Sequence, residues 1–376
     1  MSRSDASAPS RRRALTGLGL AAGAALTTTL ATTPARATTL ATATTPATPT
    51  GALPVLQPGD DWAAVLAATP QVQLLPGATY TLAAAVALPD GCHIQGNGAT
   101  VTVADDTTGA LTATGRSTIT VTGVRFLGRA GNPLDTAPSF HHVAVALTRS
   151  TDVRITDCDF TNWRGAGVTV NGSSADDYFA YRVKLTGNAF LNCYFGVSAA
   201  DRSEYSQLTA NSFAYCRLAI WNSSGNWTIH GNSVVGCYGA YYSFARTSPY
   251  GALTSDNWAH GSLTGNTFNH SNGGAGELWN AGTAFPIGGT SQDPGSGVVV
   301  SGVLPPTFTG NTLWYSDVSA TDLAGTRWLL SGNTFSNLTI TCTGTTPVAL
   351  AGTQSNGAAN APTLAGNVKD LFAALY

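Results

Sequence analysis

Short runs of alternating apolar and polar residues cover most of this chain, and each run leads through a small turn motif. In residues 227–234 the apolar side chains fall on every second position, as in a strand that is buried on one face. Gly231-Asn232 supplies the bend within this run, because both residue types tolerate left-handed backbone angles. The same turn recurs before an apolar residue at positions 126, 160, 190, 213, 234, 268, 313 and 335.

The spacing of these turns predicts the architecture. The shortest intervals are near 22 residues, and the longer ones, of 30 to 45 residues, have the length of that unit with a loop inserted. A period of this length is typical of stacked units, each of which buries its apolar face only against its neighbours. We therefore predict an all-β, single-stranded parallel β-helix with one coil for each interval.

Two ladders of identical side chains follow from stacking the coils. The turn asparagines would lie about 4.8 Å apart and hydrogen-bond to one another, as stacked amides do in cross-β structures; they are Asn188, Asn211, Asn232, Asn266, Asn311 and Asn333. Cys193, Cys216 and Cys237 also recur once per coil, in a register that points them inward. Free cysteine behaves there as a small apolar residue, so we predict buried thiols without metal-binding or catalytic roles.

The N-terminal region predicts export. Residues 1–37 contain the twin-arginine pair Arg11-Arg12, an apolar stretch over 14–30 and the small-x-small sequence Ala35-Arg36-Ala37, which together indicate a twin-arginine signal peptide. Residues 38–53 read as a disordered Thr/Ala/Pro-rich linker, and residues 54–376 as one solenoid domain. We expect a secreted protein, monomeric or homotrimeric, with no membrane span.

The charge of the mature chain limits the kinds of partner that it can bind. Removing residues 1–37 leaves 13 basic and 19 acidic residues, a formal charge of −6, and two lysines. Nucleic-acid binding depends on neutralising phosphates, so this balance argues against it. A negative surface also weighs, less strongly, against a polyanionic substrate.

The two ends read as caps for a solenoid. Residues 60–66 have the pattern of a capped amphipathic helix, and we expect a closing helix over 368–372. With the segments 74–80 and 94–100, which open the first coils, this order resembles the pectin-lyase-like superfamily of right-handed β-helix proteins. The resemblance implies a right-handed helix with short N- and C-terminal capping helices. It further implies a polysaccharide substrate, bound in a groove over the strand that follows each turn motif.

That strand can be aligned across four coils, at 167–170, 196–199, 219–222 and 240–243. The alternation predicts an outward column of Thr169, Ser198, Trp221 and Tyr242, preceded at the turn by Arg164, Tyr194, Arg217 and Tyr238. Aromatic rings and guanidinium groups suit sugars, through stacking and forked hydrogen bonds. Aromatic residues are also common in β-strands that bind no ligand, so packing within the sheet is the competing interpretation.

Inserted segments flank the same strand, at 129–142, 172–181, 201–206, 244–259 and 271–303. They contribute His142 and Arg246 to the predicted substrate-binding set, and they contain both glutamates of the chain. The competing interpretation for each of these residues is an ordinary solvated loop. The candidate catalytic carboxylates in the insertions are Glu204, Glu277, Asp201 and Asp256.

Three functions remain open. A glycoside hydrolase or transglycosylase needs two carboxylates, and the negative charge slightly favours this reading and a neutral glycan. It would need no cofactor. A polysaccharide lyase needs a base near the sugar C5 proton and a cationic group or Ca²⁺ to neutralise a uronate. The candidates for these roles are Arg217, Arg164, Tyr242 and His142, with Asp176, Asp177 and Asp201 as the candidate Ca²⁺ ligands. A non-catalytic glycan-binding protein would use the aromatic face alone. The chain lacks the combined N-T-D, D-D and G-H-G signatures of the polygalacturonases.

Overall fold

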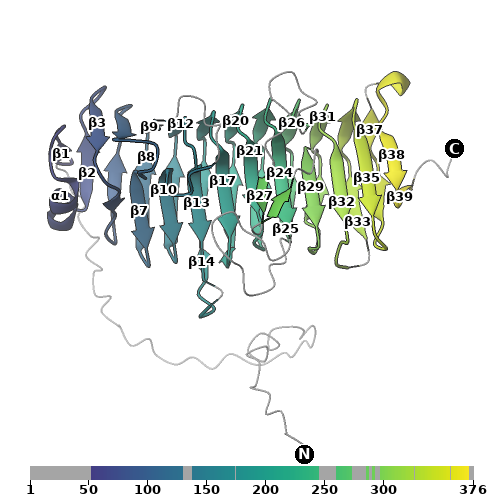
Figure 1. Ribbon diagram of the computed structural model, residues 1–376, viewed down its shortest axis with the longest axis horizontal. Coiled ribbons are helices and arrows are strands. Elements are labelled where there is room, and N and C mark those ends of the chain that lie inside the picture. The colour runs from purple at the N-terminus through teal and green to yellow at the C-terminus, as the bar shows by residue number, and fades with distance from the viewer. Residues whose placement is uncertain are drawn as a thin grey trace, which may run out of the picture. The chain divides into compact units, whose positions relative to one another are not determined.

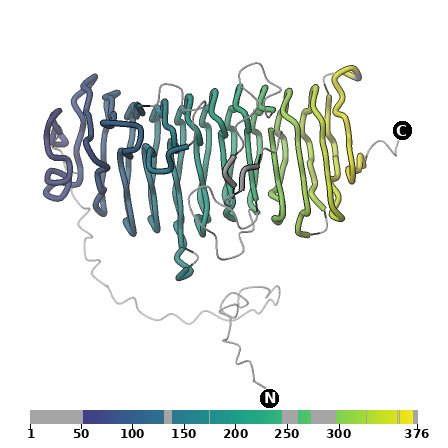
Figure 2. Tube along the Cα trace, viewed as in Figure 1, coloured from purple at the N-terminus to yellow at the C-terminus, as the bar shows by residue number. Residues whose placement is uncertain are grey.

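The computed structural model describes residues 52–129, 138–173, 175–244, 260–272, 285–287, 290–292, 297–325, 327–355 and 357–371. These residues form one right-handed parallel β-helix, in which strands from successive coils stack side by side (Figure 1). The tube view follows the chain from coil to coil (Figure 2). The predicted signal peptide and all but the last two residues of the predicted linker lie outside the described residues.

Each coil contributes strands to three parallel sheets, which we name sheets A, B and C. The strands of sheet A are, in stacking order, β1 (Val55–Leu56), β2 (Gln71–Leu74), β5 (His93–Gln95), β8 (Ser117–Thr122), β11 (Thr151–Thr156), β15 (Lys184–Thr186), β19 (Ser206–Thr209), β22 (Trp227–His230), β25 (Gly261–Thr264), β30 (Thr307–Thr309), β33 (Trp328–Ser331), β36 (Val348–Ala351) and β39 (Val368–Asp370), with β14 (Ala180–Tyr181) and β18 (Ser203–Glu204) alongside.

Sheet B follows the Gly-Asn turns. Its strands are β3 (Thr79–Leu82), β6 (Thr100–Val103), β9 (Arg125–Leu127), β12 (Asp159–Thr161), β16 (Ala189–Leu191), β20 (Ser212–Ala214), β23 (Ser233–Val235), β26 (Thr267–Asn269), β31 (Thr312–Trp314), β34 (Thr334–Ser336) and β37 (Gln354–Ser355).

Sheet C follows sheet B in each complete coil and contains the strand predicted to line a groove. Its strands are β4 (Val86–Ala87), β7 (Leu111–Thr114), β10 (Val143–Thr148), β13 (Ala166–Asn171), β17 (Phe195–Ala200), β21 (Leu218–Asn222), β24 (Gly239–Phe244), β29 (Val298–Ser301), β32 (Val318–Thr321), β35 (Thr339–Thr343) and β38 (Thr363–Gly366). A short antiparallel pair, β27 (Phe285–Ile287) and β28 (Thr290–Gln292), and a 3-10 turn at Ala358–Asn360 complete the described elements.

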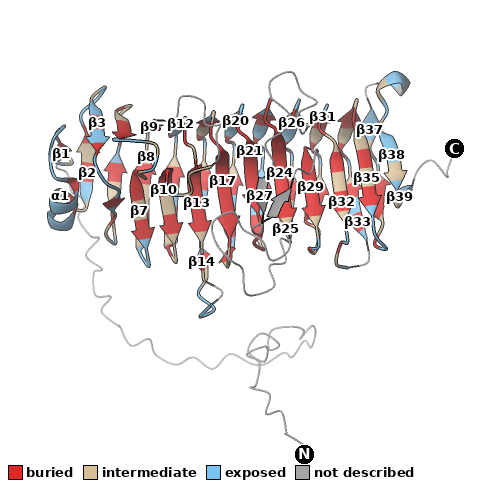
Figure 3. Cartoon of the chain, in the orientation of Figure 1, coloured by how far each residue is buried: buried red, intermediate tan, exposed pale blue. Residues whose placement is uncertain are grey.

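The register of sheet B confirms the spacing read from the sequence. Each apolar residue that follows a turn motif pairs with its counterpart in the next coil, from Phe126 through to Phe335. The rings of the first four, Phe126, Phe160, Phe190 and Phe213, stack at 5.1, 4.8 and 4.7 Å between centroids. Figure 3 shows the buried positions recurring in strands such as β13, β17 and β21. The core is therefore a set of columns, each built from one position of the coil.

The asparagine ladder is present with all six predicted rungs. In each rung but the last, the backbone N–H and the side-chain Nδ2 both donate to Oδ1 of the next asparagine, at 2.8–3.1 Å. Nδ2 also donates to a backbone carbonyl, such as that of Leu185 for Asn211. The amides thus satisfy the buried polar groups of the turn, which would otherwise cost free energy.

The buried cysteines and the N-terminal helix also match the prediction. Cys193, Cys216 and Cys237 are buried free thiols. The helix is α1 (Trp62–Ala68), and the side chain of its N-cap residue Asp61 accepts from two backbone N–H groups of the first turn. The predicted closing helix is wrong where it can be seen: Val368–Asp370 forms β39, which pairs with β36. None of the helices in the described part of the chain has the length and apolar character needed to span a bilayer.

Candidate functional site

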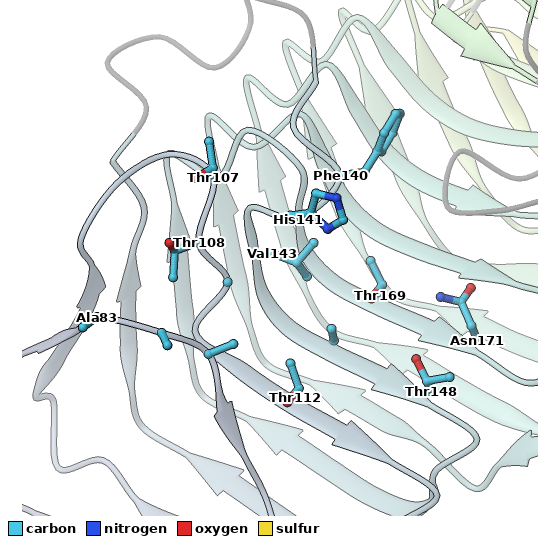
Figure 4. Close-up of a pocket in the computed structure, with 14 residues that line it drawn as sticks. Ala83, Thr107, Thr108, Thr112, Phe140, His141, Val143, Thr148, Thr169 and Asn171 are labelled. Carbon is cyan, nitrogen blue, oxygen red and sulfur yellow. The ribbon is translucent and has the colours of Figure 1, made fainter. Parts of the chain in front are cut away.

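An open groove runs over the outer face of sheet C in its N-terminal half. It has a volume of about 470 Å³, and its floor includes Thr112, Ala146 and Thr169, which occupy one register row across β7, β10 and β13. Thr148 and Asn171 pair in the next row. Figure 4 shows their side chains along the groove, with Phe140 and His141 on one wall and Thr107 and Thr108 on another. The groove is therefore lined with hydroxyl, amide and aromatic groups.

Charge is absent from the strands under this groove. Every described strand of sheet C consists of apolar, hydroxyl, amide, cysteine and glycine residues, with no Asp, Glu, His, Lys or Arg. Asp105 precedes the wall residues Thr107 and Thr108, and hydrogen bonds from Thr107 and then Thr108 lower its pKa to about 2. Asp105 is therefore ionised at neutral pH and unsuited to donating a proton. Among the described residues, a catalytic acid would therefore have to come from the turns and loops beside sheet C.

Aromatic side chains fill the same face further along the stack. The register row continues from Thr169 through Ser198, Trp221 and Tyr242 to Val299, as the alignment of the strands predicted. The sequence, however, predicted an open sugar-binding column, and these residues are buried. Trp221, Tyr242 and Val299 belong to a second apolar cluster outside the coil interior. The cluster consists of Val143, Ala166, Tyr194, Phe195, Leu218, Trp221, Tyr238, Tyr242 and Val299. Their rings pack on one another, and so do not present open faces to solvent.

The turn column entering sheet C is likewise closed. Arg217 is 1% exposed and its guanidinium lies 3.6 Å from the ring centroid of Tyr238, a cation–π contact. Burial raises the pKa of Tyr194, while the charge of Arg217 and a hydrogen bond from it oppose that rise. These three side chains form one buried unit. A role as an exposed base or sugar clamp, which the lyase hypothesis required of Arg217 and Tyr242, does not fit this burial.

The N-terminal end of the turn column has a structural role. Arg164 forms an ion pair with Asp106, with 2.6 Å between Nη1 and Oδ2. The Arg164 backbone N–H donates to Nδ1 of His142 at 2.9 Å. The His142 ring is fully buried and lies 4.6 Å from the Trp163 ring. The predicted substrate contact of His142 is therefore not available, because its ring is enclosed and one nitrogen is used by the backbone.

The burial of His142 predicts a pH dependence of stability. Burial, more than the nearby charges, lowers the pKa of His142 to about 4. In the unfolded chain the ring titrates near its usual value of ~6.5. The unfolded state therefore binds an extra proton as the pH falls from ~6.5 to ~4, and the free energy of unfolding should fall by about 2–3 kcal/mol over that window. Urea unfolding of wild type and His142→Gln at pH 7 and 4.5 measures this. Equal losses in the two proteins would contradict the assignment.

Two predicted carboxylates lie at the carboxyl edge of sheet C. Asp201 directly follows β17, whose last residue Ala200 pairs with Asn171 of the groove. Gly172 approaches this turn so closely that a Cβ would lie 2.6 Å from the Asp201 carbonyl oxygen. Asp201 has a φ of 47°, a left-handed conformation that favours Asn and Gly and is tolerated by Asp. The row that crosses the groove therefore ends beside Asp201.

Glu204 stands three residues further on, in β18. Its side chain is 9% exposed, and Oε2 accepts a hydrogen bond from Asn226 Nδ2 at 2.9 Å. Glu204 pairs in register with Tyr181 of β14. The asparagine partner, which the sequence did not point to, fixes the carboxylate on a short strand. The structure thus places Asp201 and Glu204 on one turn between sheets C and A.

The proposed calcium ligands are engaged elsewhere. Asp176 pairs with Arg149, with 2.5 Å between the charged atoms, and Asp177 pairs with Arg202 at 3.2 Å. Across the ranges that the structure describes, no group of three or more His, Cys, Asp or Glu side chains could hold a metal ion. In this structure Asp176 and Asp177 are therefore each paired with an arginine, and the Ca²⁺ site stays a prediction from the sequence. Arg246, Asp256 and Glu277 lie outside the described residues.

Comparison with known families supplies the classification. A family model described as adenovirus EB1 55K protein / large t-antigen matches residues 53–245, slightly more than half of the 376-residue chain. The chain belongs to this family. The matched residues of this adenovirus EB1 55K family member include the open groove, the aromatic cluster up to β24, Asp201 and Glu204. No curated protein matches the chain.

Solved structures are similar in fold. The endo-xylogalacturonan hydrolase from Aspergillus tubingensis superposes with a TM-score of 0.54 and 16% identity, covering 82% of this chain and 95% of the hydrolase. A GH87 alpha-1,3-glucanase catalytic unit from Streptomyces thermodiastaticus strain HF3-3 has a TM-score of 0.47 and 12% identity, covering 82% of this chain and 65% of that one. An alginate lyase from Paenibacillus sp. strain FPU-7 has a TM-score of 0.39 and 10% identity, covering 82% and 96%. The fold of this EB1 55K family member is the pectin-lyase-type β-helix that the sequence resemblance implied.

The groove residues Thr148, Asn171, Phe140 and His141 were not among the predicted site residues. The alignment of sheet C strands began at 167, and extending it to residues 111–114 and 143–148 would have placed Thr148 beside Asn171. The signal was the alternation of small apolar and hydroxyl residues in those runs. Nothing in the local sequence, by contrast, shows which part of the face stays open.

Proposed function

We propose that this protein is a secreted enzyme that cleaves or transfers glycosidic bonds of a neutral polysaccharide, with Asp201 and Glu204 as its carboxylates. One observation carries the proposal. The open groove over sheet C lies beside the turn that bears the two acids, because Asn171 of its lining pairs with Ala200, the residue before Asp201. A glycan in the groove would have the acids at one edge.

The lining of the groove favours an uncharged sugar. Thr112, Thr148, Thr169 and Asn171 offer donors and acceptors, and Phe140 offers an aromatic side chain, which is the usual composition of a site that fixes a neutral ligand. The strands of sheet C that the structure describes bring no Lys or Arg to pair with a uronate. Arg164 is already paired with Asp106 at the turn. A lyase acting on a uronate polymer therefore has less support.

The chemistry asks for two carboxyl groups in different protonation states. One donates a proton to the leaving-group oxygen, and the other, ionised, acts as a nucleophile or activates water. A separation of about 5–5.5 Å gives retention and about 6.5–9.5 Å gives inversion. Asp201 and Glu204, three residues apart on a turn stabilised by the Asn226 hydrogen bond, are the pair proposed for these roles. The endo-xylogalacturonan hydrolase from Aspergillus tubingensis has the same fold, and this similarity supports glycosidic-bond cleavage as the reaction class.

Blocking the groove tests where the glycan binds. Ala146 is half-buried and its Cβ faces the groove, so Ala146→Trp should fill the volume and weaken neutral-glycan binding at least ~10-fold, since a ring of that size displaces a sugar. Leu329→Trp, at an exposed position of β33 in sheet A, is the matched control and should bind as wild type. Affinity electrophoresis through gels containing xylan, galactan, dextran or inulin gives the measurement. Unchanged retardation of a folded Ala146→Trp protein would move the site elsewhere.

A further inference from the structure

Sheet B presents an uncharged outer face over most of its length. From β16 to β37 its strands contain no Asp, Glu, Lys or Arg. One register row of this sheet runs through Leu191, Val235, Asn269 and Trp314, and Leu191, Val235 and Trp314 are exposed. Trp314 in β31 lies five coils beyond β12, whose coil also contains β13 of the groove floor, or roughly 24 Å along the stack. This end of sheet B is therefore separate from the groove.

Three aromatic side chains gather where this row turns towards sheet C. Trp314 is 37% exposed and Tyr315 is 42% exposed, and their ring centroids lie 6.2 Å apart. The exposed His270 ring lies 4.8 Å from the Tyr315 ring, at an interplanar angle of 30°. The strands that lead into these residues, β26 and β31, are neighbours in the stack (Figure 1). We name Trp314, Tyr315 and His270 the corner cluster.

The backbone at this turn shows that the tyrosines are not required by the fold. In seven successive coils the residue after the sheet B strand has a left-handed conformation, and its N–H donates to a carbonyl of the next coil. Four of the seven are Asn or Gly, which tolerate this conformation: Asn162, Asn192, Gly236 and Asn337. The others are Tyr215 at φ 53°, His270 at 48° and Tyr315 at 46°. A bulky tyrosine is disfavoured there, and such strain is concentrated at functional sites.

The chemistry around the corner cluster suits a neutral glycan. Flat aromatic rings offer apolar faces to sugars, and the hydroxyl groups of Thr312 and Thr334, paired in the neighbouring row, offer hydrogen bonds. Asp317 is already used at the turn, where its carboxylate accepts from a backbone N–H at 2.6 Å. The exposed parts of Trp314 and Tyr315 amount to an area on the order of 150 Å². A stable protein interface buries about 800 Å² per partner, so the cluster fits a sugar chain better than a protein.

We propose that the corner cluster is a second glycan-binding site, which attaches the protein to the surface of an insoluble neutral polysaccharide. This site goes beyond the proposed function, because it is separate from the groove and requires no catalysis. Tyr215 is 40% exposed and occupies the same turn position three coils before Tyr315, roughly 14 Å away along the stack. A glycan chain that runs along the stack contacts Tyr215 and the cluster together. The groove stays free for another chain.

The next coil supplies a matched replacement for the test. Ser336 and Asn337 occupy the positions that Trp314 and Tyr315 occupy one coil earlier. The double variant Trp314→Ser/Tyr315→Asn therefore copies a native turn of this chain, and its melting temperature should be unchanged or raised. Its affinity for particles of insoluble xylan, cellulose or mannan, measured by depletion of protein from the supernatant, should fall at least ~10-fold.

Two further variants make this result specific to the cluster. Leu127→Ser changes an exposed residue of the same row far from the rings and should bind the particles as wild type does. The double variant is also measured in the Ala146→Trp background, where the groove is filled, and the same loss is expected. Turnover of soluble glycans by the double variant should stay within about twofold of wild type, because the two sites are distant.

Three outcomes would overturn the site. Equal binding of the double variant and wild type would remove the cluster from particle binding, as would wild-type protein that binds none of the particles. A change in soluble-glycan turnover beyond twofold would contradict the independence of the two sites. Sedimentation velocity covers the remaining occupant: wild-type dimers that the double variant loses would make the cluster a contact between two copies of this chain instead of a glycan site.

Discussion

Replacing Asp201 by Asn is expected to lower kcat about 10²–10⁴-fold, the range for losing a positioned acid or base. The substitution removes the proton chemistry and keeps the shape of the side chain. Asn also tolerates the left-handed backbone that Asp201 adopts, at φ 47°, so the turn should fold as before. Glu204→Gln should show a similar loss, since a glycosidase needs both carboxyl groups. Initial rates on the best substrate, with circular dichroism of each variant, provide the measurement.

Asp152→Asn is the matched control for this result. Asp152 also has a left-handed backbone, at φ 54°, and lies at the start of β11 in sheet A, but its carboxylate pairs with Arg182. This variant should keep kcat within about twofold, because surface ion pairs contribute little. Near-wild-type turnover in both Asp201→Asn and Glu204→Gln would remove these residues from the mechanism. Asp256 and Glu277 would then be the remaining carboxylates predicted from the sequence.

The second large effect is expected in the asparagine ladder. Asn211→Ala deletes an amide that accepts from the N–H and Nδ2 of Asn188 and donates to Asn232 and to backbone carbonyls of Leu185 and Thr209. Several buried polar groups would lose their partners at once, each costing about 1–3 kcal/mol. Allowing for partial relaxation, we expect a loss of about 3 kcal/mol in the free energy of unfolding. Urea titration followed by tryptophan fluorescence reports it.

Ser212→Ala provides the comparison for the ladder. Ser212 follows Asn211 directly but is exposed on β20, so its loss should stay within about 0.5 kcal/mol of wild type. A similarly small change for Asn211→Ala would mean that water replaces the ladder hydrogen bonds. The coils would then be held together by their apolar columns alone.

The fold was predictable because the coil repeats itself. Each position of the turn meets its own copy one coil away, so intervals between Phe126, Phe160, Phe190 and Phe213 translate directly into strand pairs. The contacts between the turn asparagines follow from the same intervals. The closing helix failed because residues 368–370 are too few to show a period, and pairing with β36 decides their structure.

The site was only partly predictable, because burial depends on partners distant in sequence. Alternation correctly placed Trp221 and Tyr242 on the outer face of sheet C, yet it could not show that their rings would pack and close that face. Nor could the sequence show that Arg149, on the preceding coil, pairs with Asp176. The turn spacing did identify the segment that bears Asp201 and Glu204, since it interrupts the coil just after β17.

The central claim, cleavage of a neutral polysaccharide, is tested most directly by product analysis with the purified mature protein. Xylan, galactan, dextran and inulin are incubated alongside polygalacturonate and alginate, and both reducing ends and unsaturated uronate products are measured. We predict new reducing ends, or transferred products, from at least one neutral polymer and no unsaturated products from the uronates. Unsaturated uronate products from either acidic polymer, with no change in any neutral one, would contradict the account.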